Sequence, residues 1–271
     1  MYILDDPVLL AQCARIKTMI EEVAHDPKYK EDYYASKYHH WQLSPSVQLS
    51  EIEKFEEKAG IQLPIEYVYY LTQVGGGGAC PGTFFSDFKS EWRSYDGLDR
   101  VSVQLHRIMS EEEWEQEFGG YEEDEEDEED EADRTEGTIS LCAMDLTYEA
   151  YLIVSGPLRG RVVYLDWEGD FAPMWPKGSY DFLTWCENFY SELLAGYDIN
   201  PTWNFMWQEP GNEEALIRAF HNQKDRKYQK EVLYSFRKFQ SLSEEAYTFL
   251  KSVQYPEFQD TVTEILGWFD H

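Results

Sequence analysis

The sequence is short of basic residues. It has 23 Lys and Arg against 53 Asp and Glu among 271 residues, which gives a formal net charge of −30. Because a surface this acidic repels phosphate groups, we expect no direct binding to nucleic acid. The same sign of charge disfavours anionic membrane surfaces. A basic protein partner is compatible with this composition.

Cysteine is also scarce. The four cysteines lie far apart and form no C-x-x-C pair. This spacing argues against a disulfide framework or a cysteine zinc site and fits a reducing cytosol. The first residues lack the basic region of a signal peptide and reach the acidic pair Asp5-Asp6. No apolar run approaches the ~18 residues that span a bilayer. We therefore expect a soluble, cytoplasmic protein.

Motifs of catalysis are missing as well. The run Gly75–Gly78 is followed by Ala-Cys-Pro and not by the Gly-Lys-Ser/Thr of a phosphate-binding loop, so a turn that needs positive φ explains it better. The six histidines show no zinc-enzyme spacing, and the adjacent His39 and His40 are expected to pack or face solvent. Cys80 has no recognisable histidine partner. The sequence predicts no catalytic residue, metal ligand or cofactor, and we expect a binding protein and not an enzyme.

Helix signals dominate the first part of the chain. Asp6-Pro7 supplies an N-cap and a first-turn proline, and we assign residues 1–45 to an N-terminal helical extension. Ser50 and Glu53 have the spacing of a capping box, which predicts a helix that Gly60 ends. A second helix is expected from Pro64 into the glycine-rich turn.

The apolar pattern then changes to that of strands. Segments 101–105, 138–144, 149–155 and 160–167 predict four strands, with 171–175 as a candidate fifth. A helix capped by Ser179 and ending near Gly196 follows. We assign residues 46–200 to an α+β domain, a sheet with flanking helices. Within it, residues 111–133 carry 16 acidic and no basic side chains. We expect this insertion to be disordered beyond a capping box at Ser110–Glu113.

The chain ends in a segment with helical periodicity only. Residues 212–221, 226–240, 243–254 and 256–269 predict four short helices. Residues 201–271 are therefore expected to form an all-α helical-hairpin extension. Hairpins of this size are similar to solenoid repeats, although the sequence shows no internal repeat.

An ordered motif lies in the two helices that begin the α+β domain. It consists of a hydrophobic residue and a glutamate, a glycine, Leu-Pro-x-x-Tyr, a hydrophobic helix and a Gly-Gly turn. Its residues are Phe55, Glu56, Gly60, Leu63, Pro64, Tyr67, Leu71, Gly75 and Gly76. The motif resembles the SUKH superfamily (Smi1/Knr4-like domain) over roughly residues 46–195. The resemblance implies a small α+β sheet domain, to which neither the acidic insertion nor the helical tail belongs.

The resemblance also implies a function. Bacterial members of the superfamily are in the main immunity proteins that bind and neutralise toxins, many of them nucleases, whereas eukaryotic relatives are intracellular regulatory scaffolds. We therefore expect a bacterial immunity-type protein that occludes a cognate basic protein toxin. The alternative is a regulatory scaffold that uses the helical tail to bind its partner. The sequence gives no indication of the oligomeric state.

Acidic and aromatic residues near the end of the fourth expected strand are candidates for the partner-binding surface. Rigid aromatics ringed by carboxylates suit a Lys/Arg-rich partner, although the same pattern suits an ordinary edge of the core. The acidic insertion is expected to steer a basic partner or to be a solvated loop without a role. The candidates are Asp166, Trp167, Glu168, Asp170 and Trp175 at the strand end, and Glu122, Asp124 and Asp127 in the insertion.

Overall fold

The computed structural model describes residues 2–31, 33, 35–83, 87–88, 95, 97–118, 134–144, 147–166, 168, 171–178, 181–199 and 202–269. Its helices are α1 (Pro7–His25), α2 (Lys28–Glu31), α3 (Ser36–His39), α4 (Leu49–Ala59), α5 (Ile65–Gln73), α6 (Glu111–Phe118), α8 (Phe182–Leu194), α9 (Thr202–Trp207), α10 (Glu213–Asn222), α11 (Arg226–Tyr234), α12 (Glu244–Ser252) and α13 (Gln259–Phe269). Three 3₁₀ turns are η1 (Val103–Leu105), η2 (Ser235–Lys238) and η3 (Pro256–Phe258). The strands are β1 (Thr138–Ala143), β2 (Tyr148–Ile153) and β3 (Val162–Asp166).

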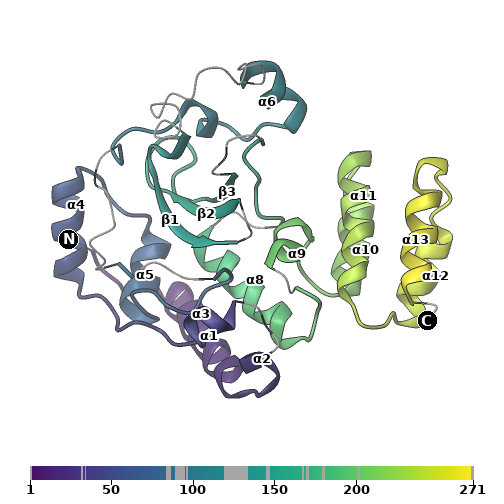
Figure 1. Ribbon diagram of the computed structural model, residues 1–271, viewed down its shortest axis with the longest axis horizontal. Helices are drawn as coiled ribbons and strands as arrows, with labels where there is room; N and C mark the ends of the chain where they lie inside the picture. Colours follow the sequence, from purple (N-terminus) through teal and green to yellow (C-terminus); the bar gives the residue numbers. More distant parts are fainter. Residues whose placement is uncertain are drawn as a thin grey trace.

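The mixed α+β fold class is confirmed. The three strands form an antiparallel meander in the order β1-β2-β3, with Ala150 opposite both Cys142 and Tyr164. Helices α1, α5 and α8 lie on one side of this sheet (Figure 1). Residues of alternate positions on the strands face these helices, and Trp185 of α8 donates a hydrogen bond to the Tyr164 hydroxyl of β3 at 2.8 Å.

Two of the five expected strands are absent from the described sheet. Residues 103–105 form η1, because the N–H of Leu105 donates to the carbonyl of Ser102 at 2.9 Å and curls the chain. Within η1 Leu105 is buried and Val103 is 54% exposed, while the half-buried Val101 just before η1 packs against the same cluster as Leu105. Residues 171–175 contribute a single bridge, in which Met174 and Tyr164 exchange two hydrogen bonds of 2.8 and 2.9 Å.

Both edge strands of the sheet are contacted by neighbouring chain. The Met174 bridge covers part of β3, and a second bridge joins Arg161 to Asp181 at the start of this strand. On the other side, the N–H of Thr83 donates to the carbonyl of Ala143 in β1 at 2.9 Å. Backbone groups at both edges therefore already have partners.

Several helix ends lie where the sequence predicts them and two do not. The Asp6 carboxylate accepts from the first-turn amides of α1, Ser110 and Glu113 form the expected capping box, and Gly60 ends α4 at φ 70°. The predicted caps Ser50 and Ser179 are wrong, since Gln48 caps α4 and Asp181 caps α8. The Asp181 carboxylate accepts from Thr184 N at 2.9 Å, and Ser179 itself lies outside the described residues.

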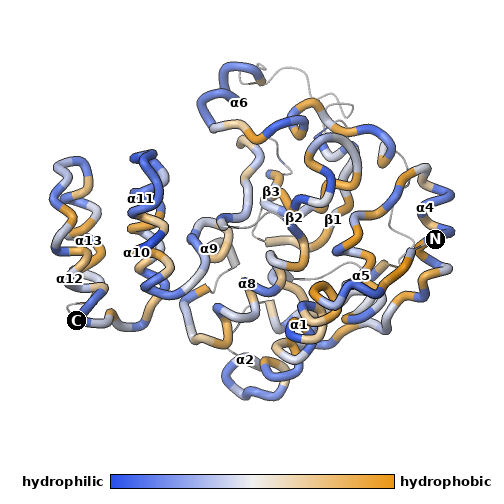
Figure 2. The backbone as a smooth tube through the Cα atoms, turned by 180° about the vertical axis from the view of Figure 1, so that it is seen from behind, coloured by the Kyte–Doolittle hydropathy of each residue, from blue (hydrophilic) through white to orange (hydrophobic). Residues whose placement is uncertain are grey.

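Two large hydrophobic clusters divide the buried side chains. The first extends from Cys13 to Met206, so α1 packs in the same core as the sheet, α5 and α8. The second joins α10 to α13, with Phe236 and Phe258 fully buried at its centre. Figure 2 shows apolar chain concentrated in the sheet and its backing helices, whereas α6 and α11 are largely hydrophilic. The ring of Tyr197 packs against both clusters.

Candidate protein-binding surfaces

Glu56 of the motif holds neighbouring chain segments in place through hydrogen bonds. Its Oε1 accepts a hydrogen bond from the N–H of Leu63 at 2.7 Å and another from the hydroxyl of Tyr2. Burial and the neighbouring carboxylate raise the pKa of Tyr2. The guanidinium of Arg159 donates to the carbonyls of Gln62 and Leu63 at 2.7–3.1 Å. The motif glutamate therefore fixes the turn between α4 and α5 and is too buried to contact a partner.

The Gly-Gly turn of the motif is explained by a close approach of two chain segments. A Cβ on Gly75 would lie 2.9 Å from the Ser44 carbonyl oxygen, and one on Gly76 would lie 2.8 Å from that of Pro45. Gly78 follows at φ 94°, a conformation that glycine adopts without strain. Phe55, Leu63, Tyr67 and Leu71 of the motif are buried as well. These residues of the motif therefore build the core and are not exposed to a partner.

Cys80 and His39, the two side chains considered as catalytic or metal-binding candidates, are buried. Burial raises the pKa of Cys80, which disfavours the reactive thiolate, and its Sγ donates to the Gly82 carbonyl at 3.2 Å. Burial lowers the pKa of His39 to about 4. The ring of His39 packs on Trp41 with centroids 4.7 Å apart. No group of three or more His, Cys, Asp or Glu lies together as a metal site in the described part of the chain.

The sheet face opposite the helices is covered by a small third cluster. Tyr151, Ile153, Val163 and Leu165 face outward, and Leu105 of η1 packs on them with the half-buried Trp175 at the side. Helix α6 begins six residues after Leu105 and projects above this face (Figure 1). The sequence-predicted Trp175 is therefore part of the outer face of the sheet.

Helix α6 carries those carboxylates of the acidic insertion that lie within the described residues. All of its glutamates are exposed: Glu111, Glu112, Glu113, Glu115 and Glu117. Arg107 forms ion pairs with Glu113 and Glu117 at 3.4 and 2.9 Å, and Lys227 of α11 lies 3.5 Å from Glu111. Within the described residues, Glu112 and Glu115 have no ion pair. We call the exposed carboxylates of α6 the α6 acidic surface.

The remaining sequence-predicted contact residues have mixed locations. Asp166, at the end of β3, is buried, whereas Glu168 is exposed. The exposed ring of Phe171 stacks on Tyr148 with centroids 6.3 Å apart. Five predicted contacts lie outside the described residues: Trp167, Asp170, Glu122, Asp124 and Asp127. The strand-end surface stays a prediction, with Glu168 and Trp175 as its accessible described members.

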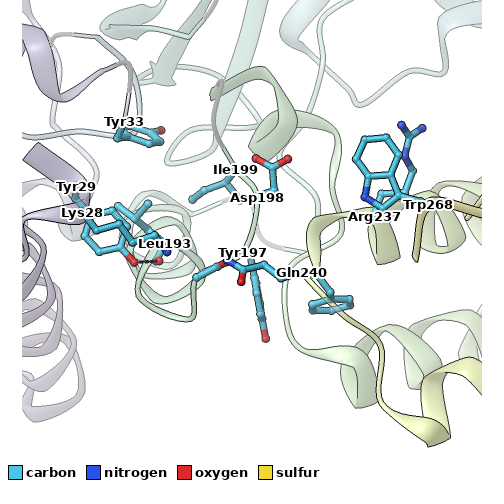
Figure 3. Close-up of a pocket in the computed structure, with 12 residues that line it drawn as sticks. Lys28, Tyr29, Tyr33, Leu193, Tyr197, Asp198, Ile199, Arg237, Gln240 and Trp268 are labelled. Atoms are coloured by element: carbon cyan, nitrogen blue, oxygen red, sulfur yellow. Dashed lines mark hydrogen bonds between the residues drawn. The ribbon is translucent and has the colours of Figure 1, made fainter. Parts of the chain in front are cut away.

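A second surface lies where the C-terminal helices meet the rest of the chain. Two cavities of about 400 and 430 Å³ share Asp198, Arg237 and Trp268. Figure 3 shows the first of them, with the three shared residues labelled. The first cavity extends toward Lys28, beside the hydrogen bond from the Tyr29 hydroxyl to the Leu193 carbonyl. The second is bordered by α9 on one side and by α11, η2 and α13 on the other. We call this second cavity, lined by Asp198, Trp207, Tyr234, Arg237 and Trp268, the junction groove.

A buried ion pair holds the two sides of this junction together. The ammonium of Lys238 in η2 lies 2.6 Å from Oε1 of Glu192 in α8 and donates to the carbonyl of Glu209 at 2.7 Å. Burial lowers the pKa of Lys238 and raises that of Glu192. Next to this pair, the N–H of Asp198 donates to the Lys238 carbonyl at 2.7 Å. The junction groove therefore has rigidly connected walls.

Sequence reasoning missed the junction groove. Its residues come from segments near 198, 207, 237 and 268, and docking of the helical tail alone brings them together. The sequence carries no pattern that joins these segments, and the exposure of Trp207 and Trp268 is visible only in the structure. Among the described residues, no helix has the length and apolar character that a bilayer crossing requires.

A small antiparallel sheet backed by helices, with exposed acidic and aromatic side chains, defines a mixed α+β domain. Residues 46–239 match the family model of the SMI1 / KNR4 family (SUKH-1), and the chain belongs to this family. The match continues past residue 200 through α9, α10, α11 and η2. Domains of this family are generally toxin-immunity-like and bind partner proteins. No curated protein and no solved structure gives a significant match.

Proposed function

We propose that this protein is a bacterial, cytoplasmic immunity-type protein that neutralises one cognate toxin by binding and occluding it. The observation that carries the proposal is the family match over residues 46–239. The inhibition is by binding alone, without chemistry on the toxin. The burial of Cys80 and His39, which leaves both without access to a substrate, supports this part.

The charge of the chain favours a basic toxin. The net charge is −30, and the α6 acidic surface places five exposed carboxylates next to the outer face of the sheet. Such a field raises the rate of encounter with a basic protein and is screened over about 8–10 Å at physiological salt. Trp175 adds an aromatic ring on the same side of the sheet as η1, and Glu168, just after the end of β3, adds an exposed carboxylate. A basic nuclease has the surface chemistry that fits.

The primary test is protection of cells. Expression of the toxin whose gene neighbours that of this protein should stop growth, and co-expression of this protein should restore it. Equal killing with and without this protein would overturn the proposal. Purified toxin and protein should also form a complex in which the toxin is inactive.

A charge variant tests how the complex forms. Replacing Glu112 and Glu115 by glutamine removes two exposed carboxylates of α6 that lack ion pairs in the described structure. The association rate should fall several-fold at low salt and converge with the wild-type rate at high salt. The matched control is the replacement of Glu21 and Glu22 on α1, which removes the same charge elsewhere. An equal fall of the association rate in both variants would show that the charges of α6 contribute no more than the same charges elsewhere on the surface.

The second candidate function is an intracellular regulatory scaffold. The hydrophobic cluster of α10 to α13 favours it, because these helices have a core of their own on which a second partner-binding surface can be built. Affinity capture of the partner separates the two functions: a toxin stops growth when expressed alone, and a regulatory partner does not.

A further inference from the structure

The junction groove has one charge that the described structure leaves unbalanced. Arg237 lies 3.0 Å from Glu264, and Lys177 lies 2.5 Å from Glu231. These two pairs neutralise the other charged residues that line the groove. The carboxylate of Asp198 is exposed and has no ion pair or side-chain hydrogen bond within the described part of the chain. The groove therefore has a net negative charge at Asp198.

Two tryptophans give the groove faces that suit a cation. Trp207 and Trp268 are 51% and 52% exposed. The guanidinium of Arg237 already lies over the Trp268 ring, 4.6 Å from its centroid. Trp207 has no ring or cation contact within the described residues, so its face is open. Tryptophan faces attract ammonium and guanidinium groups, and the attraction grows as water is excluded.

The size of the groove fits a side chain and not a whole domain. Its volume of about 430 Å³ lies near the lower end of the range for ligand pockets. Lys28 lies at the opposite end of the neighbouring cavity and does not line the groove. An anionic occupant would meet the Asp198 carboxylate, and the one cation among the described lining residues, Arg237, already has Glu264 as a partner.

We propose that the junction groove binds an arginine or lysine side chain of a protein partner. Asp198 is the counterion, Trp207 stacks on the cationic group, and Trp268 with Arg237 closes the other wall. The proposal rests on the proposed function only in taking the partner to be a basic protein. It adds a second contact, separate from the α6 acidic surface. Trp and Arg are enriched among interface hot spots, and a Lys or Arg cation over a Trp face is attracted to it.

A peptide titration of the full-length chain tests the proposal. The ligand is an acetylated, amidated Gly-Arg-Gly tripeptide, and the observable is the indole N–H signal of each tryptophan, assigned with Trp207→Phe and Trp268→Phe. We expect the peptide to shift the Trp207 and Trp268 signals selectively, with binding in the millimolar range. The same tripeptide with citrulline in place of arginine keeps the shape and lacks the charge. It should bind about tenfold more weakly, because the charge-assisted contact is lost.

A pair of variants locates the counterion. Asp198→Asn should weaken the arginine peptide about tenfold, and Glu22→Gln, which removes one exposed charge on α1, should leave its affinity within twofold. Indole signals that do not move at 10 mM peptide would overturn the proposal. So would equal binding of the citrulline peptide, an unaffected Asp198→Asn variant or stronger binding of a Gly-Glu-Gly tripeptide. The comparison of the arginine and citrulline peptides uses the unsubstituted chain, so its result does not depend on whether a variant folds.

The outcome is independent of the toxin experiment. Selective indole shifts together with a failure of toxin protection would reject immunity and retain the cation-binding groove. Toxin protection that survives Asp198→Asn, with no indole shift, would retain immunity and reject the groove.

Discussion

Replacing Lys238 by methionine removes an ammonium group from the most buried charged position of the junction and keeps the length of the side chain. The Lys238 side chain is 0% exposed and that of its partner Glu192 is 4% exposed. In the variant, Glu192 keeps the Gly211 N–H at 2.8 Å as its hydrogen-bond donor but loses its counterion. Removing one member of a buried pair costs about 3–5 kcal/mol, and we expect the free energy of unfolding at pH 7 to fall by that amount.

The loss should depend on pH in a defined direction. Burial raises the pKa of Glu192 even with Lys238 present, and removal of the ammonium raises it further. A carboxyl group whose folded pKa exceeds its unfolded value contributes full stability below the unfolded pKa, about 4.3, and loses it as the pH rises through the folded pKa. The deficit of Lys238→Met should therefore be largest at pH 7 and shrink as the pH falls toward 4.3.

Urea unfolding followed by tryptophan fluorescence and circular dichroism measures both effects. Lys224→Met, at an exposed lysine, is the matched control and should change stability by less than about 0.5 kcal/mol. The double variant Lys238→Met/Glu192→Gln should recover stability because no uncompensated charge remains. A cost below about 1 kcal/mol for Lys238→Met, or a double variant no more stable than the single one, would refute the reasoning.

Three further predictions follow from other buried sites. Gly76→Ala should cost about 1–3 kcal/mol of unfolding free energy in urea, because its Cβ would lie 2.8 Å from the Pro45 carbonyl oxygen; an unchanged midpoint would contradict the close approach. Burial lowers the pKa of His39 to about 4. The neutral ring therefore contributes fully to the free energy of unfolding above about pH 6.5, and up to about 3 kcal/mol of that free energy is lost as the pH falls to 4. In His39→Gln this part of the pH dependence of the urea midpoint should disappear. The cysteine thiols should react with a disulfide reagent only after denaturation, and one fast-reacting thiol in the native protein would disagree with the structure. All four are buried: Cys13, Cys80, Cys142 and Cys186.

Local signals of the sequence were the reliable ones. The Asp6 cap, the Ser110–Glu113 capping box and the glycine at the end of α4 depend on residues within one helical turn, and all three are confirmed. The predicted caps Ser50 and Ser179 are wrong because α4 begins at Leu49 after Gln48, whose N–H donates to Glu51, and α8 begins at Phe182 after Asp181, whose carboxylate accepts from Thr184 N. Such an ambiguity of one or two residues is inherent in polar helix starts.

Longer-range features were out of reach of the sequence. The segment 101–105 alternates like a strand, yet Val101 and Leu105 pack on the face of the sheet and residues 103–105 curl into η1. The Lys238–Glu192 pair joins positions 46 residues apart that carry no pattern. The same holds for the junction groove, which exists only because α13 and η2 dock beside α9. The surface that sequence reasoning placed at the end of β3 remains a prediction.

The covered edges of the sheet restrict how this protein can recognise anything. A strand with free backbone amides invites another chain to extend the sheet, either as a partner or as an aggregate. Here Met174 occupies part of β3 and Thr83 part of β1, so that route is blocked at both contacts. Recognition through exposed side chains leaves these backbone contacts in place. Exposed residues can consequently be substituted to fit a different partner without altering strand pairing. Binding specificity can therefore change while the fold stays the same.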